Sequence, residues 1–382
     1  MLNNTSSSTP GDTPPGSGTI GVMLVDDSAV IRGILSKTLE SDPAIKVVNS
    51  VSNGEMAVSA IKKANPHIII LDIEMPVMDG LTALPKLLEI CPDAKVIMFS
   101  SLTEKGASVT MKAMTLGAVE CLVKPNSSQE TGEGTEFQKN LLNLIKGLVP
   151  ERQRTAGDDA VTMPRPSVPA AAIAPEPTAE KIVLQQGAHI YKGKPSVVAI
   201  GSSTGGPQAL FEVIKSFKDF DVPIFITQHM PATFTKILAD HIEQQSGVPT
   251  CEGAEGMAVE KGHAYVAPGG FHMKIIENDG QLSITIDSGP PENFCKPSAD
   301  PMFRSLIDIF DKKVLGVILT GMGHDGLGGA KLLVEKGGRL IAQDEATSVV
   351  WGMPGAVAQA GICNAVIPLS EIGPHVRKIV LG

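Results

Sequence analysis

Short apolar runs alternate with amphipathic stretches along most of the chain, and this pattern predicts buried strands separated by helices. Runs this short and this apolar are typical of parallel strands that are covered on both faces. In the first part of the chain they occupy residues 22–25, 46–51, 68–71, 96–99 and 121–123. Helical stretches such as 29–40 and 56–64 lie between them. A further helix is predicted at the end of this part, because its apolar residues have the spacing of one helix face: Phe137, Leu141, Leu144, Ile145 and Leu148. Five such strand–helix units predict a doubly wound, flavodoxin-like α/β domain.

The second part of the chain repeats the alternation and adds a hairpin. Its apolar runs occupy residues 197–200, 224–227, 265–267, 314–319 and 340–342. Helical stretches such as 208–217 and 327–336 lie between these runs. Residues 273–276 and 282–286 flank Asn278-Asp-Gly280, a sequence that favours a tight hairpin turn. The pattern predicts a second, Rossmann-like α/β domain with an antiparallel hairpin insertion.

Two stretches lack any apolar period. Residues 163–177 alternate proline with small residues, which is typical of an extended linker. Residues 1–19 are rich in Ser, Thr, Pro and Gly and carry no cation, so we expect a disordered tail and no signal peptide. The predicted organisation is a tail at 1–19, a first domain at 20–149, a Pro/Ala-rich linker at 150–194 and a second domain at 195–382.

Composition narrows the possible classes of function. The 382 residues include 32 Lys and Arg against 41 Asp and Glu, and the formal net charge of −9 argues against a protein that coats nucleic acid. The longest apolar runs are too short to cross a bilayer, so we expect no direct membrane insertion and a cytoplasmic location. The five cysteines form no C-x-x-C pair, as is usual for free thiols in a reducing compartment.

Charged and hydroxyl side chains follow the predicted strands of the first domain. Asp26 and Asp27 end the first strand, Asp72 the third, Ser100 the fourth and Lys124 the fifth. Because parallel strands gather their carboxyl ends at one sheet edge, these groups should meet there. Three close carboxylates repel one another by roughly 4 kcal/mol per pair, and Mg²⁺ prefers such an oxygen-rich site. The alternative is that Asp and Ser residues at strand ends cap helices, as Asp26-Asp27-Ser28 before Ala29 could do.

A glycine-rich turn follows the first predicted strand of the second domain. Gly201-Ser-Ser-Thr-Gly205 satisfies G-x-S-x-G, a pattern that exposes its serine on a tight turn between a strand and a helix. Ser203 is therefore a candidate nucleophile. The alternative is a phosphate- or nucleotide-binding loop, although the glycine spacing differs from the dinucleotide and P-loop fingerprints.

A nucleophilic serine needs a base and a carboxylate that orients the base. His229 ends the strand after the serine turn, which would place it beside Ser203 on the sheet edge. Asp325 lies in a glycine-rich loop after residues 314–319 and suits the orienting role. His324, its neighbour in the chain, is a rival base. The order Ser, His, Asp differs from the Ser, Asp, His order of α/β-hydrolases and disfavours that fold.

The first domain resembles response-regulator receiver domains. The shared motifs are Val25-Asp-Asp-Ser28, Leu71-Asp-Ile-Glu-Met-Pro76, Met78-Asp-Gly80, Phe99-Ser-Ser101 and Val123-Lys-Pro125. The resemblance implies that Asp72 is the phosphoacceptor and that Ser100 and Lys124 contact the phosphoryl group. The magnesium ligands that it implies are Asp26 (through water), Asp27, Asp72 and the backbone carbonyl of Glu74. Cys121 departs from the aromatic residue that is usual in receivers.

The second domain resembles the catalytic domain of chemotaxis protein-glutamate methylesterases. The shared motifs occupy residues 201–207, 228–231, 267–273, 320–326 and 343–354. The order receiver, linker, esterase is also the layout of that family. The resemblance implies that Ser203 is the nucleophile, His229 the base and Asp325 its orienting partner. It further implies that the Met322 backbone N–H contributes to the oxyanion hole and that the esterase domain needs no cofactor. Cys295 stands in a segment where the family usually has a basic pair before proline.

The resemblance also implies a reaction and partners. The reaction is hydrolysis of glutamyl methyl esters on chemoreceptor cytoplasmic domains, with release of methanol, and a second activity that deamidates receptor glutamines. A chemotaxis histidine kinase would be the phosphodonor that activates the enzyme, and we expect no nucleic-acid partner. Two alternatives from other classes are a catalytically idle receiver–adaptor and a receiver-coupled nucleotide-binding protein.

Overall fold

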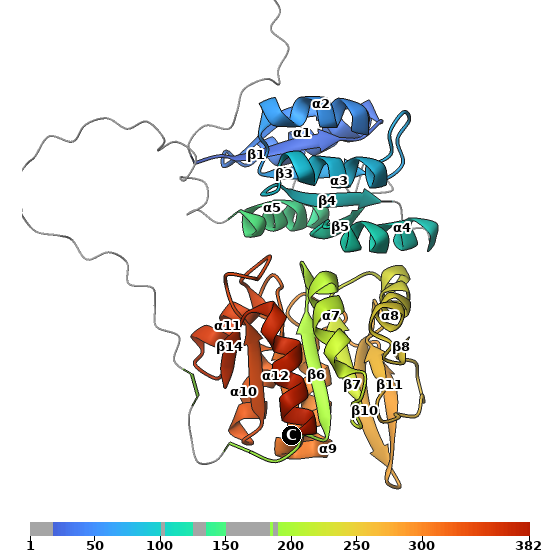
Figure 1. The fold of residues 1–382 in the computed structure, drawn as a ribbon, viewed down its shortest axis with the longest axis vertical. Coiled ribbons are helices and arrows are strands. Elements are labelled where there is room, and N and C mark those ends of the chain that lie inside the picture. The colour runs from blue at the N-terminus through green and yellow to red at the C-terminus, as the bar shows by residue number, and fades with distance from the viewer. Residues whose placement is uncertain (1–17, 101–103, 125–134, 150–183, 186–189) are drawn as a thin grey trace, which may run out of the picture. The chain divides into compact units, whose positions relative to one another are not determined.

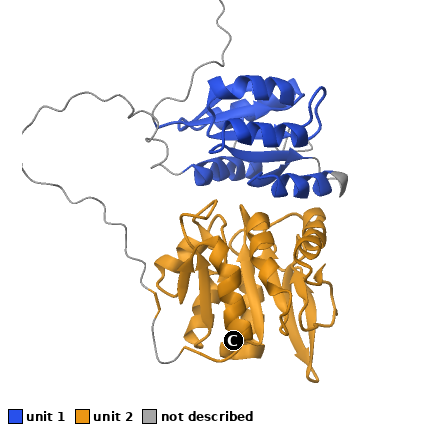
Figure 2. Cartoon of the chain, in the orientation of Figure 1, with its two compact units in different colours: residues 1–165 blue, residues 166–382 orange. Residues whose placement is uncertain are grey.

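The computed structural model describes residues 18–100, 104–124, 135–149, 184–185 and 190–382. The predicted tail up to residue 17 and most of the predicted linker lie outside these ranges. The chain divides into two compact units, residues 1–165 and 166–382 (Figure 2). No helix in the described ranges is long and apolar enough to cross a membrane.

The first unit contains a five-stranded parallel sheet in the order β2-β1-β3-β4-β5 (Figure 1). Its strands are β1 (Ile20–Val25), β2 (Ile45–Val51), β3 (Ile68–Asp72), β4 (Lys95–Ser100) and β5 (Glu120–Val123). Its helices are α1 (Ala29–Glu40), α2 (Gly54–Ala64), α3 (Gly80–Ile90), α4 (Glu104–Thr115) and α5 (Glu136–Leu148). Every residue of β1 and β3 is buried, as expected for central strands between two helix layers. The prediction of a flavodoxin-like domain is confirmed.

Helix capping in the first unit separates two interpretations of its strand-end residues. Ser28 is the residue that caps α1, because its hydroxyl accepts a hydrogen bond from the Ile31 N–H at 3.4 Å. Asp26 and Asp27 do not occupy the capping position, and Asp72 is the last residue of β3. The capping alternative therefore holds for Ser28 and leaves the three carboxylates at the sheet edge without that explanation.

The second unit contains a seven-stranded parallel sheet in the order β14-β13-β12-β6-β7-β9-β8. Its strands are β6 (Val197–Ser202), β7 (Ile224–Gln228), β8 (Thr250–Glu252), β9 (Ala264–Val266), β12 (Val314–Ile318), β13 (Arg339–Gln343) and β14 (Ala365–Ile367). The chain leaves β6 toward β7 and later returns to place β12 on the other side of β6. In open parallel sheets, the crevice at such a reversal is where ligands bind.

Helices cover both faces of this sheet (Figure 1). The helices are α7 (Gly206–Ile214), η1 (Lys215–Phe217), α8 (Ala232–Ser246), α9 (Ala299–Phe310), η2 (Asp311–Lys313), α10 (Leu327–Glu335), α11 (Met353–Gln359) and α12 (Leu369–Leu381). Helix α7 packs against α8 and α12, whereas α9 packs against α10 and the strands β6, β7 and β12. The buried side chains of α9, α10 and α11 form one core with the sheet and the hairpin.

The predicted hairpin is present and stands outside the large sheet. Strands β10 (His272–Asn278) and β11 (Gln281–Asp287) pair antiparallel, with Asn278 opposite Gln281. Asp279 and Gly280 form the two-residue loop with φ angles of 50° and 78°, the left-handed conformation that such turns require. The hairpin packs against α9. The Rossmann-like α/β domain with an antiparallel insertion is confirmed.

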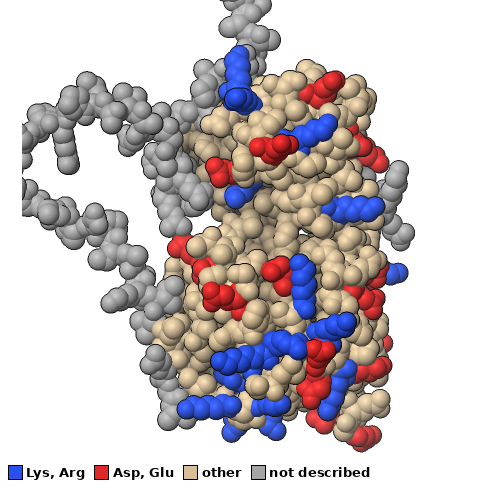
Figure 3. Space-filling view, viewed as in Figure 1, with Lys and Arg blue, Asp and Glu red and all other residues tan. Residues whose placement is uncertain are grey.

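Two details of the second unit differ from the sequence pattern. The edge strands β8 and β14, of three residues each, were not predicted. Part of the segment that we assigned to the linker contacts the second unit: the Gln185 N–H donates to the Cys363 carbonyl at 2.9 Å, and the Tyr191 N–H donates to the Gly337 carbonyl at 2.8 Å. The face drawn in Figure 3 carries both basic and acidic side chains on each unit.

Candidate functional site

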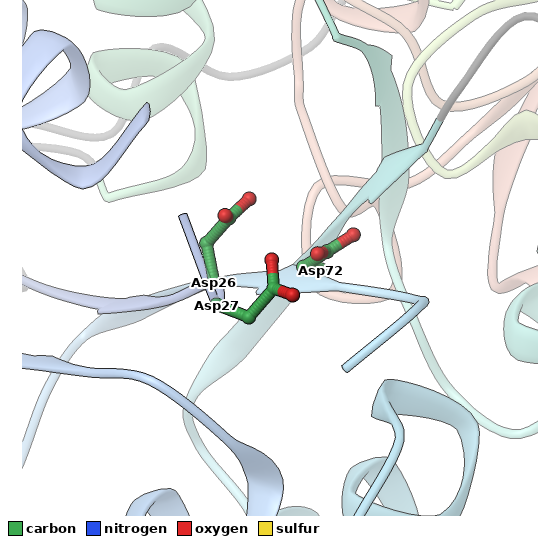
Figure 4. A group of neighbouring side chains, drawn as sticks. All are labelled: Asp26, Asp27 and Asp72. Atoms are coloured by element: carbon green, nitrogen blue, oxygen red, sulfur yellow. The ribbon is translucent and has the colours of Figure 1, made fainter. Parts of the chain in front are cut away.

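Three aspartates lie together at the carboxyl edge of the first sheet (Figure 4). Asp26 and Asp27 follow β1, and Asp72 ends β3, the strand that pairs with β1. One carboxylate oxygen from each lies within 4.8 Å of the others. Asp26 and Asp72 are each 2% exposed, whereas Asp27 is open to solvent. The strand ends thus assemble an oxygen-only donor set with one solvent-facing side.

The ammonium group of Lys124 faces this acidic cluster. Lys124 Nζ lies 2.7 Å from Asp72 Oδ2 and 3.0 Å from Asp26 Oδ2. Burial raises the pKa of Asp72 to about 6, although hydrogen bonding and charge from Lys124 act in the opposite direction. Ser100, at the end of β4, is 2% exposed on the adjacent strand. The structure therefore brings together the residues that the sequence placed at this edge.

The serine turn of the second unit joins β6 to α7 beside the loop that follows β12. Ser203 donates its N–H to the Thr320 carbonyl at 3.0 Å, and its own carbonyl accepts from the Gly206 N–H at 2.7 Å. Gly205 has φ = 76°, and a Cβ there would lie 2.5 Å from Val349 Cγ2. This position therefore needs glycine for its backbone angle and for the available space. The turn leaves Ser203 half-buried just before the first residues of α7.

Gln228 fixes the relation between the serine turn and the end of β7. It is opposite Ser202 in the β6–β7 register, so Ser203 and His229 are the next residues on adjacent strands. The Gln228 amide donates to the carbonyls of Ser203 at 2.9 Å and His229 at 3.2 Å. Its carbonyl oxygen accepts from the Ser202 hydroxyl at 2.7 Å. Sequence reasoning did not identify this buried residue as part of the site.

His229 is paired with Asp325 across the sheet edge. His229 Nε2 lies 2.8 Å from Asp325 Oδ2. Burial lowers the pKa of His229, but the hydrogen bonds to Asp325 and Cys295 outweigh it and raise that pKa to about 9. Burial raises the pKa of Asp325, but its bond to His229 and other donors hold it below its ordinary range. The rival His324 is exposed.

The Asp325 carboxylate is surrounded by donors from a distant segment. Its Oδ1 accepts from Asn293 Nδ2 at 2.8 Å and from Ser298 Oγ at 2.6 Å. Its Oδ2 accepts from the Ala299 N–H at 2.6 Å, in addition to His229. Sequence reasoning did not find Asn293 or Ser298, which follow the hairpin and precede α9. An ionised carboxylate suits this site because each of these neighbours can donate.

The loop after β12 is tied down on both sides of Gly321. The Gly321 N–H donates to the Val350 carbonyl at 3.2 Å, and its carbonyl accepts from the Met353 N–H at 2.8 Å. A Cβ on Gly321 would lie 2.8 Å from Ser203 Cβ, so only glycine allows this approach. Met322 is the next residue in the loop, and its backbone therefore follows a fixed point beside Ser203.

The comparisons with known proteins agree with this two-unit arrangement. Residues 22–133 match the model of the response regulator receiver domain, and residues 198–376 match the model of the CheB methylesterase. A protein-glutamate methylesterase/protein-glutamine glutaminase from Azospirillum brasilense is 52% identical over 366 residues, which cover 94% of this chain and 92% of that protein. The chain belongs to the protein-glutamate methylesterase/protein-glutamine glutaminase family.

Other relatives extend the comparison. A protein of the same description, of the group 2 operon of Rhodospirillum centenum, is 48% identical and covers 95% of both chains. The crystal structure of the CheB methylesterase catalytic domain of Thermotoga maritima is 38% identical, with a TM-score of 0.48, and covers 50% of this chain and all of that one. The two family models and the relatives that are 52% and 48% identical confirm the resemblance to methylesterases and receivers drawn from the sequence.

The two cysteines at which the sequence departs from the receiver and methylesterase patterns have different surroundings. The Cys121 thiol lies 3.6 Å from Thr110 Oγ1 on α4, and burial raises the pKa of Cys121 to about 12. Cys295, in contrast, lies close enough to His229 to help raise the pKa of its imidazole. The first cysteine is a half-buried residue of β5 beside α4, and the second lies next to the His229–Asp325 pair.

Proposed function

We propose that this chain is a phosphorylation-activated serine hydrolase. It removes methyl groups from glutamyl methyl esters on chemoreceptor cytoplasmic domains, releasing methanol, and converts receptor glutamines to glutamates. The observation that carries the proposal is the distance of 2.8 Å between His229 Nε2 and Asp325 Oδ2. Ser203 and His229 each follow the last residue of a strand, and those two residues, Ser202 and Gln228, are paired in the sheet. Membership of the methylesterase family supports the same reaction.

The hydrogen bond between His229 and Asp325 supports one proton path. Asp325 occupies Nε2 of the imidazole, so Nδ1 is the nitrogen left to take the Ser203 proton. Ser203 Oγ then bonds to the side-chain carbonyl carbon of the substrate. His229 returns the proton to the departing methoxide or ammonia, and a glutamyl ester of Ser203 remains. Water hydrolyses this ester, which yields glutamate and restores the serine.

The developing negative charge on the carbonyl oxygen needs a fixed donor. We assign this role to the backbone N–H of Met322, because the hydrogen bonds of Gly321 hold the loop against Ser203. The nearby N-terminus of α7 adds a favourable partial positive charge. A preorganised backbone donor of this kind contributes about 10²–10³ in rate.

In the receiver, the acidic cluster fits a magnesium ion. The donors would be Asp27, Asp72 and the backbone carbonyl of Glu74, with Asp26 acting through water. Bound Mg²⁺ supplies charge neutralisation and orients the phosphodonor. Asp72 accepts the phosphoryl group. Lys124, already 2.7 Å from Asp72 Oδ2, would hold a phosphoryl oxygen, and Ser100 from the adjacent strand would donate to another.

Regulation follows from joining these units by a long Pro-rich segment. We propose that the receiver covers the methylesterase active site until Asp72 is phosphorylated by a chemotaxis histidine kinase. Phosphorylation adds charge and acceptor oxygens at the acidic cluster and changes the receiver surface near α4. The proposed setting is the cytoplasm, where the kinase and the receptor domains are accessible.

The decisive experiment measures methanol released from methylated chemoreceptor membranes by the full chain. The proposed function requires release that depends on Ser203 and increases with Mg²⁺ and a small phosphodonor. An idle adaptor would bind the membranes and release no methanol. A nucleotide-binding protein would show a higher Tm with nucleotide, since ligands that bind the native state stabilise it.

A further inference from the structure

A tight turn carries an unusual aromatic residue beside the methylesterase site. Glu292 and Cys295 exchange two backbone hydrogen bonds, of 3.1 and 2.8 Å, across the turn. The two central residues, Asn293 and Phe294, have φ angles of 52° and 63°. Asparagine tolerates this left-handed conformation, whereas a bulky aromatic residue rarely adopts it. The turn therefore holds Phe294 in a strained backbone conformation.

The side chain of Phe294 gains nothing from packing within its own unit. It is 99% exposed, the highest value among the exposed large hydrophobic residues of the described ranges. Strain in a folded protein persists where the surroundings impose it, and it concentrates at functional sites. A fully exposed aromatic ring at a strained position suggests a contact with another molecule.

The turn is attached directly to the His229–Asp325 pair. Asn293 Nδ2 donates to Asp325 Oδ1 at 2.8 Å and also to Asp300 Oδ2 at 2.9 Å. Cys295 lies close enough to His229 to help raise the pKa of its imidazole. Phe294 therefore lies between a residue bonded to Asp325 and a residue near His229.

The outer side of the turn is held as firmly as the inner side. The guanidinium of Arg304, on α9, donates to both carboxylate oxygens of Glu292, at 2.7 and 2.9 Å. Beyond the turn, Lys296 Nζ donates to the Ser288 carbonyl at 2.8 Å. A ring presented on such a fixed turn loses little conformational freedom when it binds, which favours its use as an anchor.

We propose that Phe294 is a positioning residue that packs on an apolar side chain of the substrate protein next to the glutamyl ester. The inference rests on the proposed function and names a recognition residue for it. A glutamyl side chain has only two methylenes before its ester, so the substrate backbone must approach the active-site edge closely. The turn that is bonded to Asp325 and lies near His229 then meets the surface around that glutamyl group. An aromatic ring suits such a contact because it buries a large apolar area.

The test compares two substrates and uses the full chain throughout. One substrate is a purified methylated receptor cytoplasmic fragment, and the other is the γ-methyl ester of N-acetylglutamate amide. The variants are Phe294→Gly, which relieves the left-handed strain, and Phe294→Trp, which keeps an aromatic ring. Asp311→Gly is the matched control, because Asp311 also has a positive φ (50°) and is exposed. Asp311 lies before the start of β12, whereas Asp325 follows the end of that strand.

The proposal predicts a change in substrate preference. For Phe294→Gly, the ratio of kcat/KM on the receptor fragment to kcat/KM on the small ester should fall about tenfold or more, through KM, with no loss in Tm. Phe294→Trp and Asp311→Gly should keep the wild-type ratio. An unchanged ratio for Phe294→Gly would overturn the proposal. So would a faster unphosphorylated Phe294→Gly enzyme on the receptor fragment, because the ring would then contact the receiver. If the wild type hydrolyses neither substrate, the proposed function itself is wrong and the inference falls with it.

Discussion

Replacing Asp325 by asparagine tests the proposed proton path most sharply. The Ala299 N–H, 2.6 Å from Asp325 Oδ2, is a backbone group that can only donate. The asparagine carbonyl oxygen must therefore take the Oδ2 position, where it also accepts from His229 Nε2. The imidazole keeps its tautomer, and Nδ1 remains the nitrogen that is available for the Ser203 proton. The substitution removes the negative charge and, at the Oδ1 position, the acceptor for Asn293 Nδ2.

The pKa of His229 gives the size of the effect. Its rise from 6.5 to about 9 corresponds to about 3.4 kcal/mol of preference for the imidazolium, part of which Asp325 supplies. Losing all of this preference for the imidazolium would slow proton transfer from Ser203 to His229 by up to about 300-fold. The base must be neutral to accept a proton, so wild-type kcat/KM should rise with pH to about 9. In Asp325→Asn the pKa falls, and the rise should level off at lower pH.

The two effects combine into a pH-dependent loss. At pH 10 the variant should be up to about 300-fold slower, whereas at pH 7 the loss should shrink to a few fold, because most wild-type His229 is then protonated. The assay is methanol release from the small glutamyl ester between pH 6 and 10. A loss of about 10⁴-fold at every pH would mean that the tautomer is reversed, as in enzymes where the amide can turn. Equal rates at pH 10 would show that Asp325 does not act on His229.

Three further predictions concern other residues of the two units. Ser203→Ala should abolish methanol release with Tm within about 2 °C of wild type, and residual turnover near the wild-type rate would refute the serine mechanism. Gln228→Leu leaves the buried Ser202 hydroxyl and the His229 carbonyl without this partner. Urea unfolding should therefore show a free energy of unfolding that is lower by roughly 2–4 kcal/mol, and ester hydrolysis should be slower. An unchanged free energy of unfolding would mean that water replaces the amide. A fragment starting at residue 184 should outrun the unphosphorylated full chain on receptor esters, and full-length Asp72→Asn should stay slow with Mg²⁺ and phosphodonor; a fragment no faster than the full chain would contradict autoinhibition.

The sequence predicted the residues that end parallel strands because topology alone brings such positions together. Ser203 and His229 follow paired strands, and the Ser202–Gln228 register places them side by side. The same rule brought Asp26 and Asp72 to one edge in the receiver. These placements depend only on strand order and direction, which short apolar runs and right-handed crossovers already determine.

The supporting residues could not be predicted in this way. Asn293 and Ser298 lie on a connection between the hairpin and α9, and no periodic pattern fixes the path of that connection. The turn at Glu292–Cys295 has the left-handed angles of a tight hairpin loop, yet its central pair, Asn-Phe, lacks the glycine that normally reveals one. Gln228 was overlooked for a different reason, since a buried polar residue at a strand end shows its role only once its partners are known.

The same connection explains why one carboxylate can serve both the chemistry and the architecture of the methylesterase site. Asp325 holds His229 with one oxygen, and the two oxygens together accept three hydrogen bonds from residues 293–299. The turn and the start of α9 are thus attached to the orienting carboxylate. A substrate that presses on the turn must act on residues bonded to the His229–Asp325 pair, so recognition by Phe294 and alignment of the base are mechanically connected. Substitutions in this turn should therefore be judged by substrate preference, because a rate on one substrate mixes the two effects.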